Sequence, residues 1–335
     1  MKLKVGVIGL GYWGPNFVRN FIRYERTQLV WVCDISEKAL KKTCQGYPYL
    51  KSTQNYHDLL KDNSLDLIII TTPPNSHYII AKKALEAKKH VIVAKPLALS
   101  SKGANDLLKL ANENNLLLHT DLTYLYTAAV RTIKNLIDKG AVGNPLYYDS
   151  IRTNLGLIQQ DVNVIWDLAI HDLSIIDYWF NLKPEKVFAV ASKHNENSKT
   201  EEMAHISVTY QNHFIAHIHV SWLSPVKIRT TLVGGTNKMV YFDDLQPDEK
   251  IKIYDKGVKI ASDSITPFKP AYRSGNIITP TLSQEEALFL EIRDTTNQIM
   301  RKSINYLNAQ LSIRILKILE ACDKSIKTGH STAIR

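Results

Sequence analysis

The first third of the chain alternates short apolar runs with amphipathic segments of helical period. Apolar runs predict strands at residues 4–8, 29–33, 65–71, 90–93 and 116–120, and helical patterns cover 15–24, 36–44, 76–87 and 100–114. The run at 65–71 is apolar without alternation, as expected of a strand buried on both faces of a parallel sheet. Strands alternating with helices predict a doubly wound α/β Rossmann domain, here residues 1–121.

The pattern changes to two-residue alternation later in the chain. Helices are predicted at 127–139 and 166–180, and alternation predicts strands at 203–210, 213–222, 228–233, 238–242 and 250–254. Gln211-Asn212 and Gly234-Gly235 predict hairpin turns. Residues 267–280 carry three prolines and predict a long loop, and helices at 283–301 and 307–328 close the chain. We expect a second, α+β domain over 122–335 with a large, mostly antiparallel open sheet.

Composition and charge narrow the class of protein. The 335 residues are 44% hydrophobic and 22% charged, which is ordinary for a globular chain. The net charge of +10 comes from lysines scattered along helical segments, and no basic tract interleaved with aromatics predicts a nucleic-acid partner. No apolar run has the length of a membrane span, and the three cysteines lack metal-ligand spacing. These features predict a cytoplasmic protein with no membrane partner and no metal site.

A glycine-rich turn joins the first predicted strand to the first predicted helix. Gly9, Gly11 and Gly14 form the G-x-G-x-x-G pattern, which permits a tight turn, close approach to a pyrophosphate, and close packing of helix on strand. Asp34 stands at the end of the next strand, about twenty residues further on. Its carboxylate would accept hydrogen bonds from a ribose diol and repel a 2′-phosphate, which predicts NAD as the cofactor. The alternative is a glycine turn beside a surface aspartate.

Two further strand ends carry polar residues at the edge where an open α/β sheet binds ligands. Thr72, Pro73 and His77 follow the strand at 65–71, where a rigid loop can lie along a dinucleotide. Lys95 follows the strand at 90–93, where an ammonium can hydrogen-bond a substrate hydroxyl and favour its alkoxide. Taken alone, the first segment also fits a turn that caps the next helix, and Lys95 also fits a solvated lysine.

The helix predicted at 166–180 carries a second candidate pair. Asp167 and His171 are four residues apart and therefore share one helical face. An imidazole can accept a proton at physiological pH, and a carboxylate one turn away can hold its orientation. The alternative is a structural histidine with an i,i+4 partner.

In order and spacing, these four motifs resemble the glucose–fructose oxidoreductase/inositol dehydrogenase/MocA (GFO/IDH/MocA) family over nearly the whole chain. The strongest stretches are 66–77 (DLIIITTPPNSH) and 90–97 (HVIVAKPL), with the family's D-x-x-x-H element at Asp167 and His171. The resemblance implies an NAD-dependent dehydrogenase acting on CH–OH groups. It implies catalytic roles for Lys95, His171 and Asp167, and substrate contacts from Lys95, Asn163 and His171. Cofactor-binding residues would be Gly9, Gly11, Tyr12, Trp13, Gly14, Asp34, Thr72, Pro73, His77 and Lys95.

The substrate is also suggested by resemblance. Residues 160–167 (QDVNVIWD) look like family members from nucleotide-sugar pathways, which implies a nucleotide-linked sugar oxidised at its 3-hydroxyl. The alternatives are a free-sugar or inositol-type dehydrogenase, and a non-catalytic NAD-binding sensor or scaffold. Ala94 motivates the last, because the family usually has Glu-Lys-Pro where this chain has Ala94-Lys95-Pro96. An alanine cannot supply the carboxylate expected beside the nicotinamide ribose; if it is a simple loss, Ala94→Glu should raise activity.

The motifs imply a mechanism at a domain cleft, in which His171 accepts the hydroxyl proton, Lys95 stabilises the alkoxide and Asp167 orients the imidazole. The second sheet must bury one face. Its other face is predicted to carry His213, His217 and His219, with no acidic or cysteine partner for a metal. In the family this face often mediates assembly, so we expect a homodimer or homotetramer.

Overall fold

The computed structural model describes residues 2–156, 158, 161–196, 198–260 and 270–335. The chain forms two compact units: unit 1 is Met1–Tyr126 with Glu285–Lys317, and unit 2 is Thr127–Gln284 with Ile318–Arg335. The expected division at 121/122 therefore does not include Glu285–Lys317, where the chain returns to unit 1. The return has a hydrophobic cause, because Leu288, Ile292 and Ile299 of α8 (Ala287–Met300) are buried in the core of unit 1.

Unit 1 is built on a six-stranded parallel sheet in the order β3-β2-β1-β4-β5-β6, which confirms the predicted Rossmann-type class. The strand β4 is buried at all four positions, as its unbroken apolar run predicts. The edge strand β3 and the short helix α3 (Tyr56–Lys61) were not predicted, because both are short and partly polar. The strands are β1 (Leu3–Ile8), β2 (Thr27–Cys33), β3 (Lys51–Thr53), β4 (Leu67–Ile70), β5 (His90–Ala94) and β6 (Leu118–Asp121).

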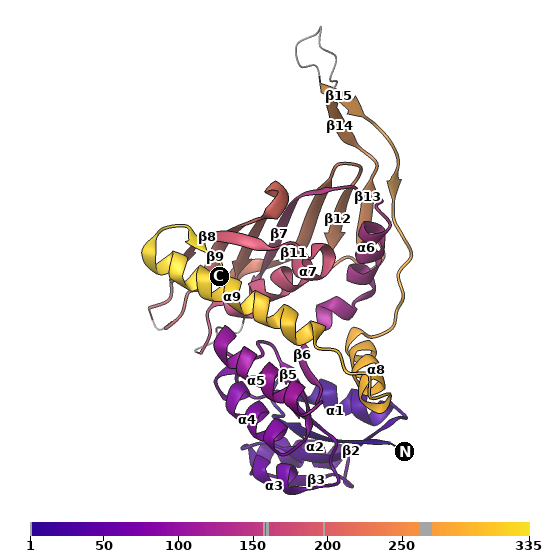
Figure 1. The fold of residues 1–335 in the computed structure, drawn as a ribbon, viewed down its shortest axis with the longest axis vertical. Helices are drawn as coiled ribbons and strands as arrows, with labels where there is room; N and C mark the ends of the chain where they lie inside the picture. The colour runs from indigo at the N-terminus through magenta and orange to yellow at the C-terminus, as the bar shows by residue number, and fades with distance from the viewer. Residues whose placement is uncertain (1, 157, 159–160, 197, 261–269) are drawn as a thin grey trace. The chain divides into compact units, whose positions relative to one another are not determined.

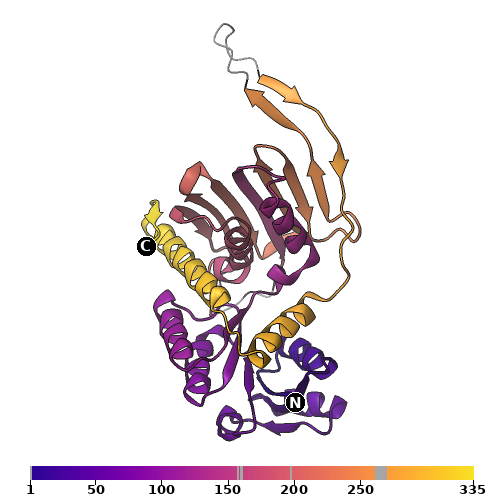
Figure 2. The ribbon, with the colours of Figure 1, turned by 45° about the vertical axis from the view of Figure 1, so that its right-hand side comes forward.

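Helices cover both faces of this sheet. Figures 1 and 2 show α4 and α5 on one face and α1 and α8 on the other. Side chains cap several of these helices as their sequences suggest: Ser36 accepts from the Ala39 N–H at the start of α2, and Ser100 accepts from the Gly103 N–H at the start of α5. The helices are α1 (Gly14–Arg23), α2 (Glu37–Gly46), α4 (Pro74–Glu86), α5 (Ser101–Glu113) and the 3₁₀ turn η1 (Thr123–Tyr126).

Unit 2 contains a nine-stranded sheet in the order β16-β13-β12-β11-β7-β10-β9-β8-β17. Its strand pairs are antiparallel except for β7 and β10, which confirms the mostly antiparallel sheet. The central strand β7 was missed in the sequence, since it mixes polar and apolar residues without a clear period. The strands are β7 (Pro145–Leu155), β8 (Pro184–Ser192), β9 (Met203–Tyr210), β10 (Ile215–Ser221), β11 (Leu223–Gly235), β12 (Met239–Asp243), β13 (Ile251–Tyr254), β16 (Ile277–Ile278) and β17 (Thr332–Ala333).

Three sequence predictions for unit 2 need correction. Gly234 and Gly235 lie within β11 rather than in a turn; a Cβ on Gly234 would come within 2.1 Å of the Tyr147 ring, so close packing explains this glycine. Of the loop predicted at 267–280, residues 267–269 lie outside the described residues, while Pro270–Arg273 (β15) pairs with Gly257–Ile260 (β14), and β16 pairs with β13. The third correction concerns His213, which lies in the 3₁₀ turn η3 (Gln211–His213) and not on β10.

Helices α6 (Ala128–Asp138) and α7 (Ile170–Phe180) lie on one face of the large sheet (Figure 2). The helix predicted at 166–180 begins as one π-helical turn, η2 (Ile165–Ala169), which runs directly into α7. Helix α9 (Leu307–Thr328) contains the boundary between the two units. None of the helices in the described part of the chain has the length and apolar character to span a membrane.

Candidate functional site

The glycine-rich turn follows β1 directly, and two of its glycines are required by the protein's own packing. Gly9 has φ +97°, and a Cβ there would lie 2.7 Å from the Thr71 carbonyl carbon. A Cβ on Gly14 would lie 2.1 Å from the Gly9 carbonyl oxygen. The turn is also tied to β2 and to the end of β4, because the Gly9 N–H donates to the Cys33 carbonyl (2.8 Å) and the Thr71 hydroxyl donates to the Gly9 carbonyl (2.7 Å).

Gly11 differs from the other two glycines. A Cβ on Gly11 would meet no atom within 4 Å, so packing within the described chain does not require glycine there. The backbone N–H groups of Gly11, Tyr12 and Trp13 have no acceptor among the described residues, and the first turn of α1 contains no acidic side chain. Open space, available donors and the positive end of a helix fit a phosphate group. The turn therefore fits the pyrophosphate of a dinucleotide.

Asp34 follows β2 and is half-buried beside the turn. One carboxylate oxygen, Oδ2, accepts from the Leu10 N–H (2.6 Å), and Oδ1 accepts from the Ser36 N–H (2.7 Å). Each oxygen keeps further acceptor capacity for a ribose hydroxyl. The carboxylate thus fits the ribose and also holds the glycine-rich turn, a second role that the sequence motif did not reveal.

The aromatic pair Tyr12 and Trp13 stands in the same turn. Tyr12 is 85% exposed, and its ring stacks on that of Trp13 with centroids 6.5 Å apart. The Trp13 indole N–H donates to Asp121 Oδ2 at the end of β6. Trp13 therefore links the turn after β1 to β6, an edge strand of the sheet.

The ends of β4 and β5 are joined by His77, whose side chain is 1% exposed. Its Nδ1 lies 2.7 Å from the Pro96 carbonyl and its Nε2 lies 2.7 Å from the Thr72 carbonyl. A carbonyl oxygen only accepts, so both contacts are hydrogen bonds when the ring carries two protons. His77 thus holds together the loops that carry Thr72 and Lys95.

In unit 2, Asp167 lies in the π-helical turn before α7 and His171 lies in the first turn of α7; both side chains are half-buried. Asp167 Oδ2 accepts from the indole N–H of Trp222 (2.9 Å), which lies between β10 and β11, so the connection of these two strands holds this carboxylate. Lys95 belongs to unit 1, where it is half-buried directly after β5.

Asn163 has a structural role that the sequence did not indicate. Its Oδ1 accepts from the N–H groups of Ile165 and Trp166 at the start of the helical segment. Its Nδ2 donates to Glu201 (3.2 Å) and to Asp323 (3.1 Å). These four bonds use the two donors and two acceptor sites of an asparagine side chain, while the substrate contact expected of Asn163 stays a prediction.

A buried ion pair lies directly beside His171 in unit 2. Arg152 Nε donates to Asp172 Oδ2 (2.9 Å), and the Tyr148 hydroxyl donates to Asp172 Oδ1 (2.9 Å). Both charged side chains are at least 95% buried, with exposures of 5% and 1%. Burial, with the Asp172 carboxylate, raises the pKa of Tyr148 well above its ordinary value. The cluster fixes the first turn of α7.

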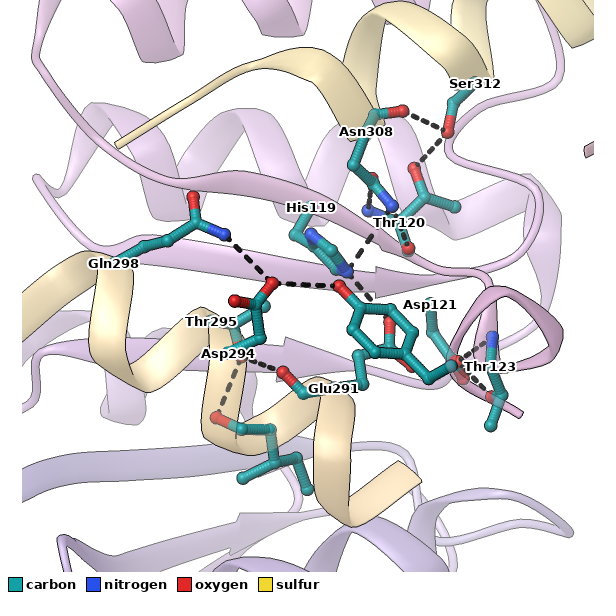
Figure 3. Close-up of polar contacts among 12 residues, drawn as sticks. His119, Thr120, Asp121, Thr123, Glu291, Asp294, Thr295, Gln298, Asn308 and Ser312 are labelled. Carbon is teal, nitrogen blue, oxygen red and sulfur yellow. Dashed lines mark hydrogen bonds and ion pairs between the residues drawn. The ribbon is translucent and has the colours of Figure 1, made fainter. Parts of the chain in front are cut away.

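A second buried cluster, in unit 1, was also missed (Figure 3). It joins His119 and Asp121 of β6 to Glu291 of α8, and His119 Nε2 lies 2.8 Å from Glu291 Oε1. Asp121 could have been predicted, because it is a polar residue at the end of a strand. Glu291 could not, because it lies 172 residues from its partner His119 and no local pattern connects the two. Among the described residues, no group of three or more His, Cys, Asp or Glu side chains is arranged to hold a metal ion.

Comparison with known protein families gives a consistent result for both parts of the chain. Residues 3–122 match the family model described as "Oxidoreductase family, NAD-binding Rossmann fold" (GFO/IDH/MocA). Residues 130–240 match the model of the GFO/IDH/MocA C-terminal domain.

Individual relatives and solved structures are more distant. The inositol 2-dehydrogenase of Salmonella typhimurium is 26% identical over 54% of this chain and 55% of its own length. The chain thus aligns with little more than half of that relative. The structure of GenD2 from gentamicin A biosynthesis, in complex with NAD, has a TM-score of 0.85 at 19% identity and covers 100% of this chain and 97% of its own. The UDP-N-acetylglucosamine 3-dehydrogenase GnnA from Acidithiobacillus ferrooxidans has a TM-score of 0.80 at 22% identity, covering 98% of each chain. These structural matches establish the fold.

Proposed function

Because the chain belongs to the GFO/IDH/MocA family of NAD-binding oxidoreductases, we propose that it is an NAD(H)-dependent dehydrogenase acting on a secondary alcohol of a sugar or cyclitol. The observation that carries this proposal is the glycine-rich turn. Gly11 faces open space beside N–H groups that have no acceptor in the described part of the chain, and Asp34 stands at the end of β2 with acceptor capacity for a ribose. The three cysteines are free thiols, which supports a reducing, cytoplasmic location as part of the proposal.

For the substrate we favour a nucleotide-linked sugar oxidised at its 3-hydroxyl. Support comes from the fold likeness to a UDP-N-acetylglucosamine 3-dehydrogenase and from the resemblance of residues 160–167, of which Gln160 lies outside the described residues. The second candidate is an inositol-type substrate, which the inositol 2-dehydrogenase relatives favour.

The proposed chemistry assigns a proton transfer to His171 and charge stabilisation to Lys95. Bound NAD would supply the hydride acceptor for the carbon that carries the hydroxyl. A ring nitrogen of His171 takes the hydroxyl proton as the alkoxide develops, and the Lys95 ammonium stabilises that alkoxide. Asp167, which Trp222 holds, orients the imidazole.

The test is the absorbance change at 340 nm when NAD is mixed with the protein and UDP-sugars, free sugars or inositols. We expect Lys95→Ala and His171→Ala each to lower kcat by about 10²–10⁴-fold, since this is the usual worth of general-base or preorganised-charge catalysis. The matched controls Lys109→Ala and His57→Ala change exposed side chains and should leave kcat unchanged. NAD binding without turnover of any substrate would support the sensor alternative, and full activity of His171→Ala would refute its assigned role.

A further inference from the structure

The end of β6 carries a buried polar network that reaches from the glycine-rich turn to α8. Asp121 is 4% exposed, and its Oδ2 accepts the Trp13 indole N–H. Its Oδ1 accepts from the backbone N–H of Thr123 (3.1 Å) and from the Thr123 hydroxyl. A carboxylate that accepts three hydrogen bonds has a fixed position, so the indole that donates to it is also fixed.

Glu291 packs against Asp121 from α8 and supplies a fourth interaction. The two carboxyl groups lie close enough to interact electrostatically. Burial, together with the neighbouring Asp121 carboxylate, raises the pKa of Glu291 well above its ordinary value, and burial also raises the pKa of Asp121. The Oε2 atom of Glu291 is buried and has no hydrogen-bond partner among the described residues.

His119 is neutral beside Glu291, and two residues of α9 hold β6 in place. Burial lowers the pKa of His119 to about 3, so its ring is uncharged beside Glu291 Oε1. Asn308 of α9 donates to the Thr120 carbonyl (3.1 Å) and accepts from the Thr120 N–H (2.7 Å), and Ser312 donates to the Thr120 hydroxyl (2.8 Å) (Figure 3). The backbone that carries Asp121 is therefore held from α9 as well.

We propose that Asp121 is a positioning residue for the cofactor turn: through the Trp13 indole it fixes residues 11–13 in the form that receives the dinucleotide, and Glu291 holds Asp121 in place. The inference rests on the proposed function, since it assumes that the glycine-rich turn binds NAD(H). It adds a requirement that the G-x-G-x-x-G motif does not contain, because part of the turn's support comes from a helix near the other end of the chain.

The experiment measures NADH dissociation constants by isothermal titration calorimetry for Trp13→Phe, Asp121→Asn and the double variant. We expect each single change to raise Kd about tenfold, as for loss of a hydrogen bond to a charged group. The double variant should be no weaker than the weaker single one, because both changes remove the same link. The matched control is Trp31→Phe, since Trp31 donates to Asp62 (2.8 Å) elsewhere in unit 1 and its loss should leave Kd unchanged.

Glu291 variants separate positioning from simple stability. Glu291→Gln keeps an acceptor for His119 and nearly the same shape beside Asp121, so it should bind NADH as the unmodified protein does, whereas Glu291→Ala should raise Kd about tenfold. If Asp121→Asn does not fold, the Kd of Trp13→Phe still tests the inference, because Trp13 is only half-buried and its replacement should leave the protein folded. Unchanged Kd in Trp13→Phe, or additive effects in the double variant, would overturn the inference and leave the proposed function standing. If the unmodified protein does not bind NADH, the proposed function fails and the inference falls with it.

Discussion

Replacing Asp34 by alanine should have two effects of different origin. The carboxylate accepts the Leu10 and Ser36 N–H groups at 2.6 and 2.7 Å, and we propose that it also accepts from the ribose of NAD. A hydrogen bond to a charged group contributes about 1.5–3 kcal/mol. Losing the ribose bond alone should therefore weaken NADH binding by about ten- to a hundred-fold. Because Asp34 is half-buried and water can reach the freed N–H groups, we expect the free energy of unfolding to fall by about 1–3 kcal/mol in total.

The two effects can be separated by comparing cofactors. Loosening of the turn should weaken NADH and NADPH alike, whereas loss of the ribose contact and of the repulsion toward a 2′-phosphate should change the ratio of their dissociation constants. We expect the unmodified protein to prefer NADH and Asp34→Ala to lose that preference. Titration calorimetry gives both constants, and urea unfolding gives the stability.

The matched control is Asp62→Ala. Asp62 also accepts two hydrogen bonds, from the Ser64 N–H (2.9 Å) and from Trp31, and these bonds lower its pKa to about 2. Its loss should reduce stability by a similar amount and leave the cofactor ratio unchanged. If Asp34→Ala weakens both cofactors equally, the carboxylate acts only through the turn and the ribose assignment is wrong.

Four further outcomes follow from the structure. Asp172→Ala should lower the free energy of unfolding by about 3–5 kcal/mol in urea titrations, because it leaves the Arg152 guanidinium buried without this carboxylate. Burial lowers the pKa of His90 to about 4, so between pH 6.5 and 4 the unfolded chain binds a proton that the folded chain does not. The free energy of unfolding should therefore fall across this window as the pH decreases, and it should fall less in His90→Gln. Ala94→Glu should weaken NADH binding rather than restore activity, since β5–β6 pairing places residue 94 beside the buried Asp121 carboxylate; in an Asp121→Asn background, which itself weakens binding, the further loss caused by Ala94→Glu should be smaller. Sedimentation equilibrium should give a mass above the 38.0 kDa of one chain, and a single monomeric species at micromolar concentration would contradict the expected homo-oligomer.

The parts of unit 1 that could be predicted are those in which adjacent residues determine the structure. The unbroken apolar run of β4 and the helical pattern at 36–44 are local signals, and both predicted their elements closely. The glycine motif likewise indicated the turn, and the demand on Gly14 is local, because its neighbour is the Gly9 carbonyl. The demand on Gly9 comes instead from Thr71 at the end of β4, which only the folded sheet brings near.

The features that were missed depend on residues far apart in the chain. The structural role of Asn163 was not predicted, because its hydrogen bonds to Glu201 and Asp323 become apparent only when those residues are brought beside it. The strand β7 owes its place to neighbours on both sides rather than to its own pattern. The pairing of Ala94 in β5 with Asp121 in β6 depends on the register of the two strands. The sequence shows that position 94 has no acidic side chain, but it does not show that the Asp121 carboxylate lies beside that position.

The return of Glu285–Lys317 to unit 1 has a consequence for biosynthesis. When the ribosome has made the first 126 residues, the apolar side of α1 lacks Leu288, Ile292 and Ile299, and Trp13 and Asp121 lack Glu291. At a translation rate of about 5–20 residues per second, the missing helix follows only after roughly ten to forty seconds, with most of unit 2 emerging in between. The nascent dinucleotide domain therefore displays an uncovered hydrophobic surface for that interval, so we expect it to engage chaperones that recognise such surfaces and to acquire cofactor affinity only near the end of synthesis.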